Sequence, residues 1–170
     1  KGCGDQYVRD YQRIYGIRSV VFRQSCIYGT RQFGIEDQGW LAWFAIAATQ
    51  NKPITIYGDG KQVRDVLFVE DLLNVYDSAI QNIDQAAGQA FNVGGGPANT
   101  ISVWQEFAPL LEKKIGKRIP TTSSAWRPGD QKIYVSDIRK AKQYLNWQPQ
   151  INVDEGISRL VDWVESIRED

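Results

Sequence analysis

Short apolar segments alternate with longer amphipathic segments along the sequence, and this alternation restricts the fold more than any other feature. IRSVVFR, residues 17–23, is β-branched and apolar, as in a buried strand. Residues 71–83 repeat apolar side chains at helical spacing. The same reading predicts further helices near 7–15, 38–51, 102–115, 136–145 and the C-terminal end, and further strands near 54–57, 89–96 and 117–124. We therefore predict an α/β fold, without an internal repeat and without a second complete domain.

Two local features carry specific expectations. The run Gly94–Gly96 follows a predicted strand and predicts a flexible turn. Ser102 and Gln105 form a capping box that would open the next helix. Pro109 lies inside that helix, so we expect a kink or a break there.

The composition is that of a soluble globular protein, with 42% apolar and 24% charged residues. Lys and Arg total 20 and Asp and Glu total 20, which argues against a nucleic-acid or membrane-surface partner, since both require a basic excess. No apolar run approaches the roughly 20 residues that a membrane span needs, and no signal peptide is recognisable. Cys3 and Cys26 are too few for a disulfide framework, so we expect a reducing cytoplasm.

Histidine and methionine are both absent from the sequence. Without histidine, this chain contains no Ser-His or Cys-His catalytic pair, no histidine general base and none of the usual zinc sites. The chain opens with KGCGDQYVRDYQRIYG, which reads as the interior of a helix rather than its beginning. We therefore expect the chain to be a fragment of a longer protein.

Arg64 is the first candidate for ligand binding. It follows a glycine turn in ITIYGDGKQVRDVLFVEDL, residues 54–72, where an apolar strand should resume. A guanidinium group can hold a phosphate through two parallel charge-assisted hydrogen bonds. Asp65 would either orient Arg64 or accept hydrogen bonds from backbone amides that shape the turn. The alternative is a surface salt bridge that contributes only about 0–1 kcal/mol.

WRPGDQ, residues 126–131, is the second candidate. Pro128 and Gly129 predict a tight turn that places Arg127 and Asp130 on the same side. An arginine for a diphosphate and a carboxylate for ribose hydroxyls would suit a nucleotide. The alternative is a plain surface turn with an aspartate-capped amide.

Other features receive structural interpretations. The glycines at 94–96 match neither the G-x-G-x-x-G pattern nor a Walker A sequence. The aromatic residues of the helix near 38–51 are predicted to pack in a core or an interface, although its N-terminal turn near Gln38 could direct free amides toward an anion. Cys26 has no histidine to activate it and is predicted to be a buried residue or part of a cavity wall.

Taken together, these segments resemble the C-terminal half of the extended short-chain dehydrogenase/reductases that act on nucleotide sugars with NAD. The resemblance spans essentially all 170 residues and is carried, in order, by VVFRQSCIYGTRQF, DQGWLAWF, ITIYGDGKQVRDVLFVEDL, FNVGGG, RPGDQ and NWQPQI…EGI…VDW. Within this family, RQSCIYGTRQFGIEDQGW is most similar to the CDP-paratose (CDP-tyvelose) 2-epimerases. The chain departs from many members at Phe68, where they have histidine, and at Cys26, where they have asparagine.

The resemblance implies that the substrate is a nucleotide-diphosphate sugar, either CDP- or UDP-linked. Arg64 matches the arginine that contacts the diphosphate, and Arg127 matches a second diphosphate arginine. Asp130 lies where the ribose is held. The remaining substrate positions implied are Gln38 near the phosphates, Ile56 and Tyr57 where the strand backbone meets the base, and Cys26 beside the sugar.

The resemblance also implies NAD as the cofactor. Lys1 matches the lysine of the Tyr-x-x-x-Lys motif, which holds the nicotinamide ribose and lowers the pKa of the tyrosine base. Gln24 and Ser25 match the loop that flanks the nicotinamide. The tyrosine would stand four residues before Lys1, and the glycine-rich dinucleotide turn would also lie upstream. We therefore expect this polypeptide alone to lack epimerase activity and to bind NAD weakly.

The expected architecture is a partial Rossmann-like unit, comprising the last helix and strand of a dinucleotide domain, plus a small mixed α/β substrate-binding domain. Residues 1–36 would belong to the first part, and residues 37–170 to a nucleotide-sugar-binding region interleaved with the final Rossmann elements. In a complete epimerase, NAD would take a hydride from a sugar carbinol and return it to the other face of the keto intermediate. Three alternatives remain open: a non-catalytic nucleotide-sugar binder, a domain that oligomerises through its exposed sheet edge, and a fragment of a nucleotide-sugar dehydratase or decarboxylase.

Overall fold

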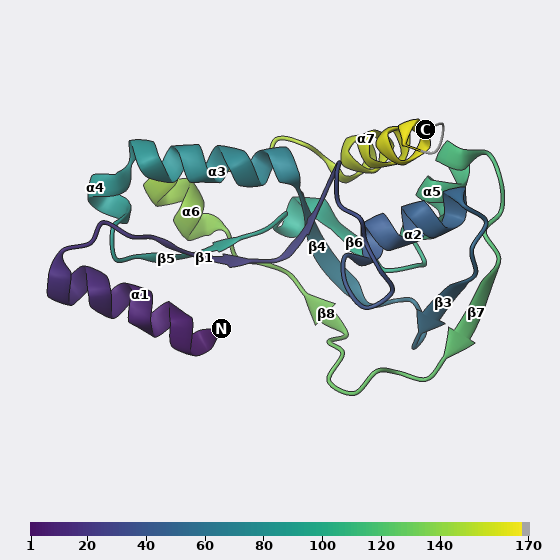
Figure 1. The fold of residues 1–170 in the computed structure, drawn as a ribbon, viewed down its shortest axis with the longest axis horizontal. Coiled ribbons are helices and arrows are strands. Elements are labelled where there is room, and N and C mark those ends of the chain that lie inside the picture. Colours follow the sequence, from purple (N-terminus) through teal and green to yellow (C-terminus); the bar gives the residue numbers. More distant parts are fainter. Residues whose placement is uncertain (168–170) are drawn as a thin grey trace.

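The structure, a computed structural model, describes residues 1–167 and has helices on both sides of a set of short sheets (Figure 1). Its helices are α1 (Gly2–Tyr15), α2 (Trp40–Thr49), α3 (Val69–Gln81), α4 (Ile83–Ala86), the 3-10 turn η1 (Pro97–Asn99), α5 (Phe107–Ile115), α6 (Arg139–Leu145) and α7 (Val153–Ser166). Its strands are β1 (Val21–Gln24), β2 (Cys26–Tyr28), β3 (Ile54–Tyr57), β4 (Val63–Phe68), β5 (Ala90–Val93), β6 (Thr100–Ser102), β7 (Thr121–Ser124) and β8 (Ile133–Tyr134). The alternation of helices and strands follows the sequence pattern.

The strand β4 is the centre of the largest sheet. It pairs in parallel with β2 and β8 and antiparallel with β6. Two further parallel pairs, β1 with β5 and β3 with β7, lie on either side of it in Figure 1. Parallel strands require a crossover connection, and here helices and turns supply those crossovers. The mixed parallel architecture confirms the predicted α/β class.

The alternation of side chains along β4 divides the molecule into two hydrophobic cores. Val66 and Phe68 face a core built with α2, α5 and α7, on the right in Figure 1. Leu67 faces the other core, which contains residues of α3, α6 and β5. Successive side chains of a strand point to opposite faces, so one strand can supply both cores. β4 is therefore a fixed wall between them.

The same alternation separates Arg64 from Asp65. The Asp65 carboxylate is fully buried and accepts hydrogen bonds from Ser25 Oγ at 2.5 Å and from the Gly96 backbone N–H at 3.0 Å. Of the two roles considered for Asp65, the structure thus supports the acceptance of a backbone amide. Arg64 points to the other face of β4.

The glycine run after β5 forms the predicted turn, but this turn is tightly packed against β4, which the prediction of a flexible turn did not anticipate. A Cβ atom on Gly94 would lie 2.3 Å from Oδ2 of Asp65, and one on Gly95 would lie 2.2 Å from the backbone oxygen of Val66. Both distances are far below any normal contact. The glycines are needed because the turn lies directly against β4.

The predicted opening of α5 also needs correction. The backbone N–H of Ser102 donates to Glu106 Oε2 at 2.7 Å, and the backbone N–H of Glu106 donates to Ser102 Oγ at 2.8 Å. The partner of Ser102 is therefore Glu106 rather than Gln105. The helix begins at Phe107, which places Pro109 in the first turn, where a backbone N–H has no intrahelical acceptor. Pro109 therefore does not interrupt the helix.

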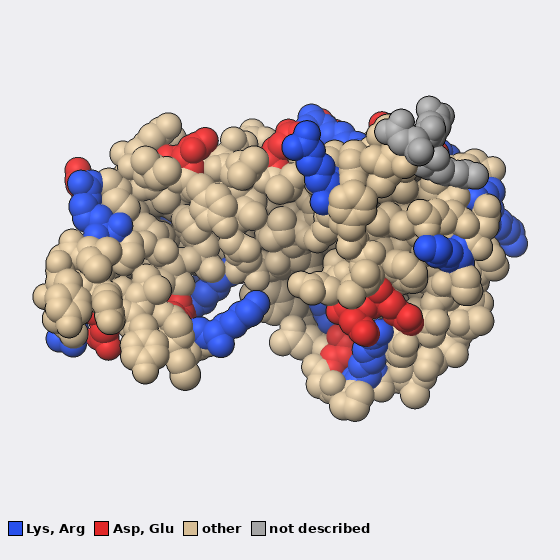
Figure 2. All heavy atoms as spheres, in the orientation of Figure 1, with Lys and Arg blue, Asp and Glu red and all other residues tan. Residues whose placement is uncertain are grey.

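The helix α1 exposes most of its apolar side chains. Tyr7, Tyr11, Ile14 and Tyr15 are all more than half exposed, and Gly16 ends the helix in the left-handed conformation. In the view of Figure 2, acidic and basic side chains are interspersed over the surface rather than segregated. None of the helices in the described part of the chain has the length and apolar character needed to cross a membrane.

Candidate functional site

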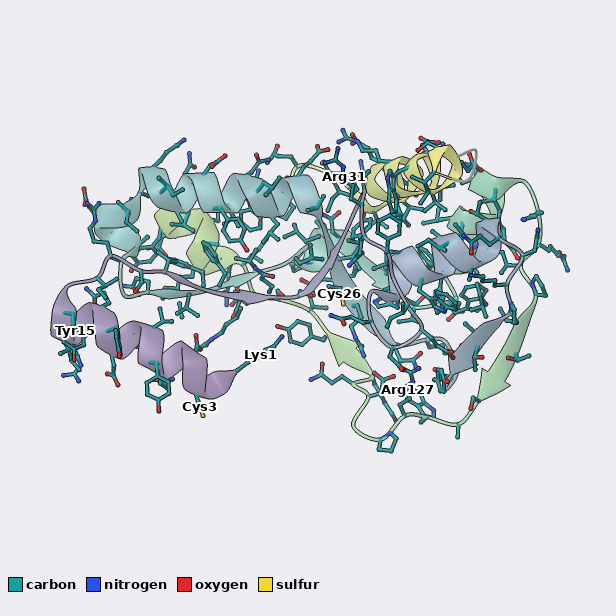
Figure 3. The ribbon with its side chains drawn as sticks, viewed as in Figure 1. Lys1, Cys3, Tyr15, Cys26, Arg31 and Arg127 are labelled. Carbon is teal, nitrogen blue, oxygen red and sulfur yellow. The ribbon has the colours of Figure 1, made fainter. Side chains whose placement is uncertain are left out.

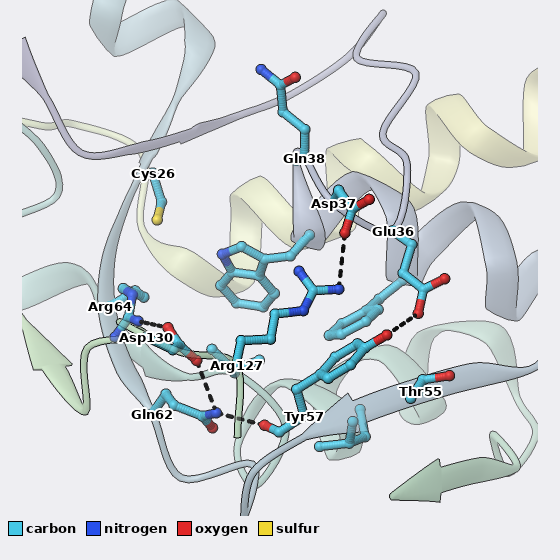
Figure 4. A pocket seen from close by; sticks show the side chains of 15 residues that line it. Cys26, Glu36, Asp37, Gln38, Thr55, Tyr57, Gln62, Arg64, Arg127 and Asp130 are labelled. Carbon is cyan, nitrogen blue, oxygen red and sulfur yellow. Dashed lines mark hydrogen bonds and ion pairs between the residues drawn. The ribbon is translucent and has the colours of Figure 1, made fainter. Parts of the chain in front are cut away.

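A cavity of about 210 Å³ lies between the N-terminus of α2, the strands β3 and β4, and the turn that follows β7 (Figure 4). Its wall combines apolar and aromatic side chains with charged ones. It is lined by Cys26, Glu36, Asp37, Gln38, Gly39, Trp40, Phe44, Thr55, Ile56, Tyr57, Gln62, Arg64, Val103, Arg127 and Asp130. An apolar wall with a few converging polar groups is the usual composition of a small-molecule site.

Arg64 is held firmly in this wall. Its Nη2 donates to Asp130 Oδ1 at 2.8 Å, and its Nη1 donates to the backbone oxygen of Val63 at 2.9 Å. The side chains of Arg64 and Asp130 are only 14% and 28% exposed. Gln62 extends this network, because its Nε2 donates to Tyr57 O at 2.6 Å and to Asp130 Oδ2 at 3.3 Å. The guanidinium group of Arg64 is thus oriented before any ligand arrives.

Arg127 reaches the same cavity from the turn after β7. The backbone N–H of Asp130 donates to the Arg127 oxygen at 3.1 Å, and Gly129 has a φ of 78°, so the predicted tight turn is confirmed. The Arg127 guanidinium carbon lies 3.8 Å from the centroid of the Tyr57 ring. Its Nη2 lies 3.1 Å from Oδ1 of Asp37. Arg127 therefore lies over the face of an aromatic ring at the mouth of the cavity.

The structure gathers all the residues that were predicted to bind the substrate. Arg64 and Arg127 lie in one cavity although 63 positions separate them in the sequence, and Asp130, Ile56, Tyr57, Gln38 and Cys26 also line it. The side-chain amide of Gln38 points away from Arg127 in Figure 4.

The residues predicted to bind the cofactor do not line this cavity. The amide of Gln24 donates to the hydroxyl of Tyr76 at 2.7 Å, and the hydroxyl of Ser25 donates to buried Asp65. Lys1 lies at the start of α1 (Figure 3). The glycine turn at 94–96 is packed against β4. The residues that line the cavity fit a phosphate-bearing ligand, and Lys1, Gln24 and Ser25 lie outside that lining.

Burial changes the pKa of one group in the cavity wall and leaves other polar atoms there short of hydrogen-bond partners. Burial raises the pKa of the Cys26 thiol, and the nearby Trp40 indole and Arg64 charge offset this only in part. Within the described residues, Gln62 Oε1 is buried without a hydrogen-bond partner, and the buried Trp40 Nε1 has only the Cys26 sulfur beside it. A buried polar atom without a partner is unfavourable by about 1–3 kcal/mol, so a ligand or an ordered water that satisfies these atoms would be stabilised.

Four polar residues of the cavity, Glu36, Asp37, Thr55 and Gln62, were not predicted from the sequence. Glu36 and Asp37 form a short acidic pair before the aromatic helix, and their partners Tyr57 and Arg127 are distant in the chain. Gln62 is 3% exposed and lies two residues before Arg64, on the same face of the extended chain. Gln62 could have been found from the sequence, because it is a polar residue two positions before Arg64 and therefore shares its face of the extended chain.

Comparison with known proteins identifies relatives along the whole chain. The model of the NAD dependent epimerase/dehydratase family matches residues 1–94. The chain is 42% identical to the CDP-paratose 2-epimerase of Salmonella typhi, over 98% of this chain and 51% of that protein. It is 33% identical to the UDP-glucuronate 4-epimerase of Thermodesulfobacterium geofontis, over 90% of this chain and 45% of that protein. The chain thus spans about half the length of these curated relatives.

Solved structures agree with these relatives. The UDP-glucose 4-epimerase of Thermotoga maritima, solved with UDP-glucose, superposes with a TM-score of 0.88 at 28% identity, over 99% of this chain and 52% of that one. The UDP-glucuronic acid 4-epimerase of Bacillus cereus, solved with UDP-glucuronic acid and NAD, gives a TM-score of 0.84 at 26% identity, over 96% of this chain and 50% of that one. The resemblance to NAD-dependent nucleotide-sugar epimerases of the extended short-chain dehydrogenase/reductase type is confirmed. The chain belongs to the NAD-dependent epimerase/dehydratase family.

Proposed function

We propose that the cavity between α2, β3 and β4 binds the diphosphate and ribose of a sugar nucleotide. On this proposal, the chain is the nucleotide-sugar-binding portion of an NAD-dependent epimerase. The observation that carries the proposal is the convergence of Arg64 and Arg127 on one cavity. Two guanidinium groups can each hold phosphate oxygens in a planar fork, and a cavity that shields them from water strengthens those bonds.

The cavity suits part of a sugar nucleotide rather than the whole molecule. Its volume of about 210 Å³ is below the roughly 300–1,000 Å³ of pockets that enclose a complete small molecule. We assign it to the diphosphate and the ribose, with Asp130 available to the ribose hydroxyls. The aromatic ring of Tyr57 supplies a flat surface beside them, and the sugar would extend toward Cys26.

We assign the nucleotide base of the ligand from the substrates named for the relatives of this chain. The relative at 42% identity is a CDP-paratose 2-epimerase, which favours a CDP-sugar. The chain is also 31% identical to dTDP-glucose 4,6-dehydratase 1 of Escherichia coli, so a dehydratase that uses a dTDP-sugar is the second candidate. Both candidates require the same diphosphate contacts from Arg64 and Arg127.

The role of this chain is binding and orientation. The family is NAD-dependent, and the cofactor would supply the hydride chemistry in a protein that also carries a dinucleotide turn and the tyrosine base. Lys1, Gln24 and Ser25 are the residues of this chain that we assign to the cofactor side. We expect the 170-residue polypeptide to bind nucleotide without turning it over.

Titration calorimetry with CDP, UDP, dTDP and the matching nucleosides tests the ligand class. We expect saturable one-to-one binding of the diphosphates, with CDP tightest, and much weaker binding of the nucleosides, because the arginines contact only phosphate. Equal affinity for a nucleoside and its diphosphate would overturn the assignment. A parallel assay with NAD and a CDP- or UDP-sugar checks turnover, and measurable epimerisation would contradict the expectation of an inactive polypeptide.

A second copy of the chain could contact the exposed apolar side of α1, where Tyr7, Tyr11 and Ile14 lie. An oligomer that covers the exposed sheet edge, as expected from the sequence, is the other form that we consider alongside the binding function. Sedimentation at increasing protein concentration tests it, and a single monomeric species throughout would exclude it.

A further inference from the structure

A short acidic loop lies at the mouth of the cavity. Ile35 and Gln38 exchange two backbone hydrogen bonds, of 2.9 and 3.0 Å, and these close a tight loop with Glu36 and Asp37 at its tip. Gly39 follows with a φ of 74°, and α2 then begins. The loop therefore presents both carboxylates from one fixed position.

The two carboxylates contact the opposite side of the cavity mouth. Asp37 Oδ1 lies 3.1 Å from Nη2 of Arg127, and Glu36 Oε1 accepts a hydrogen bond from the Tyr57 hydroxyl at 2.9 Å. Arg127 is stacked on the Tyr57 ring, so the four side chains form a continuous set of contacts across the mouth (Figure 4). Asp37 thereby forms an ion pair with Arg127 at a position that a phosphate oxygen could also take.

The charge of the lining makes this competition necessary. Among the described residues that line the cavity, the charged side chains are three carboxylates and two guanidinium groups, which leaves one negative charge in excess. The N-terminus of α2 adds roughly half a positive charge, which does not cancel that excess. A diphosphate that enters such a cavity therefore competes with the carboxylates for the two arginines.

Asp37 is the carboxylate that yields most easily. Its side chain is 83% exposed and that of Arg127 is 36% exposed, whereas the Arg64–Asp130 pair is largely buried. Exposed ion pairs are screened by water and stabilise little, while a buried pair that loses one partner leaves an uncompensated charge. Once released, Asp37 returns to water at small cost.

Resting on the proposed function of this cavity, we propose that Asp37 is an internal counter-ion of Arg127 that competes with the phosphates of the ligand and so sets the charge selectivity of the site. A ligand contacts Arg127 only if its phosphate binds the guanidinium group more strongly than the Asp37 carboxylate does. Uncharged nucleosides do not contact Arg127 and are unaffected. Asp37 is thus a specificity-determining residue that acts through Arg127.

Calorimetric titration of Asp37→Asn tests this role, with CDP, UDP, cytidine and inorganic pyrophosphate as probes. The affinity for CDP, UDP and pyrophosphate should rise roughly two- to fivefold at low salt, because the ligand no longer competes with one screened ion pair. The affinity for cytidine should be unchanged. The gain should fall as salt is raised, since ions screen exposed charges. An unchanged or weaker affinity of Asp37→Asn for both the diphosphates and pyrophosphate would overturn the proposal.

Two matched variants separate direct competition from a general change of charge. Glu36→Gln removes the same charge from the same loop and keeps an acceptor for the Tyr57 hydroxyl, so its gain should be smaller. Asp84→Asn removes an exposed carboxylate that pairs with Arg18 at 2.8 Å, outside the cavity lining, and should leave all affinities unchanged. A gain in Asp84→Asn equal to that in Asp37→Asn would overturn the proposal. Pyrophosphate distinguishes the two proposals: if Asp37→Asn binds it more tightly while CDP and UDP do not bind at all, the role of Asp37 stands and the nucleotide assignment fails.

Discussion

Arg64 donates a hydrogen bond from Nη2 to Oδ1 of Asp130 at 2.8 Å and thereby joins β4 to the turn that follows β7. Its sequence neighbour Asp65 points to the opposite face of the strand and accepts hydrogen bonds from Ser25 and from the Gly96 backbone. The adjacent arginine and aspartate are therefore not partners of each other. Strand alternation sends the cation to the cavity and the carboxylate into the interior.

The contact between the glycine turn and β4 predicts a large stability effect at Gly95. In Gly95→Ala, the new methyl group would lie 2.2 Å from the Val66 backbone oxygen, so the turn must move away from β4. We expect the free energy of unfolding to fall by about 1–3 kcal/mol or more, as for other overpacked sites. Chemical denaturation followed by circular dichroism measures this.

Gly4→Ala is the matched control for that substitution. A Cβ atom on Gly4 meets no other atom within 4 Å, and Gly4 lies inside α1. Alanine is a better helix former than glycine, so we expect Gly4→Ala to be neutral or to stabilise by about 0.5–1 kcal/mol. Equal effects of the two substitutions would mean that the turn does not pack against β4 as described.

The two cysteines should differ in reactivity. Burial raises the pKa of the Cys26 thiol. Near pH 8, a smaller fraction of Cys26 is therefore in the reactive thiolate form than would be the case for a cysteine with an ordinary pKa. Cys3 is exposed. We expect iodoacetamide to alkylate Cys26 more slowly than Cys3, and the rate at Cys26 to keep rising at higher pH. Peptide mass spectrometry over a time course measures both rates in one sample.

Nucleotide should protect Cys26 further, because Cys26 lines the cavity. Saturating CDP should slow alkylation of Cys26 and leave Cys3 unchanged, so Cys3 serves as the internal control. Alkylation of Cys26 as fast as that of Cys3, with no protection by CDP or UDP, would argue against an enclosed cavity at this position.

The planar shape of Arg127 should matter as well as its charge. Lysine in Arg127→Lys keeps the positive charge but loses the fork of donors and the stacking on Tyr57. We expect the affinity for CDP or UDP to fall about tenfold, because one charge-assisted hydrogen bond of about 1.5 kcal/mol is lost. Arg139→Lys, at an exposed arginine that pairs with Asp137, is the control and should bind normally. Unchanged affinity in Arg127→Lys would show that Arg127 acts only as a point charge or not at all.

The order of helices and strands was predictable from the sequence because each element carries its own local pattern. The strand at 21–24, the apolar helix at 40–49 and the amphipathic helix at 69–81 all form where their apolar residues predict. The prediction that the first strand is buried was wrong, because Val21 and Phe22 are only half-buried and Arg23 and Gln24 are exposed. The tight turn between Arg127 and Asp130 was predictable for a similar reason, since proline and glycine have strong local preferences.

Features that depend on distant neighbours were not predictable. The glycines at 94–96 read as a flexible turn because nothing near them in the sequence indicates that β4 lies against them. The acceptor for the Ser102 amide was assigned to Gln105 because Gln105 fits the capping-box spacing, whereas the structure uses Glu106, one residue further along. The pairing of Asp37 with Arg127 joins residues 90 positions apart, so no local pattern identifies it.

The central claim is that Arg64 binds the diphosphate of a nucleotide, and calorimetric titration of Arg64→Ala with CDP and UDP tests it most directly. The wild-type chain should bind with one-to-one stoichiometry, and Arg64→Ala should lose roughly 10- to 100-fold in affinity, as expected for charge-assisted hydrogen bonds in a shielded site. Arg18→Ala, which removes an exposed arginine outside the cavity lining, should bind as the wild type does. Binding of either nucleotide by a folded Arg64→Ala with wild-type affinity, or no binding of either by the wild-type chain, would contradict the claim.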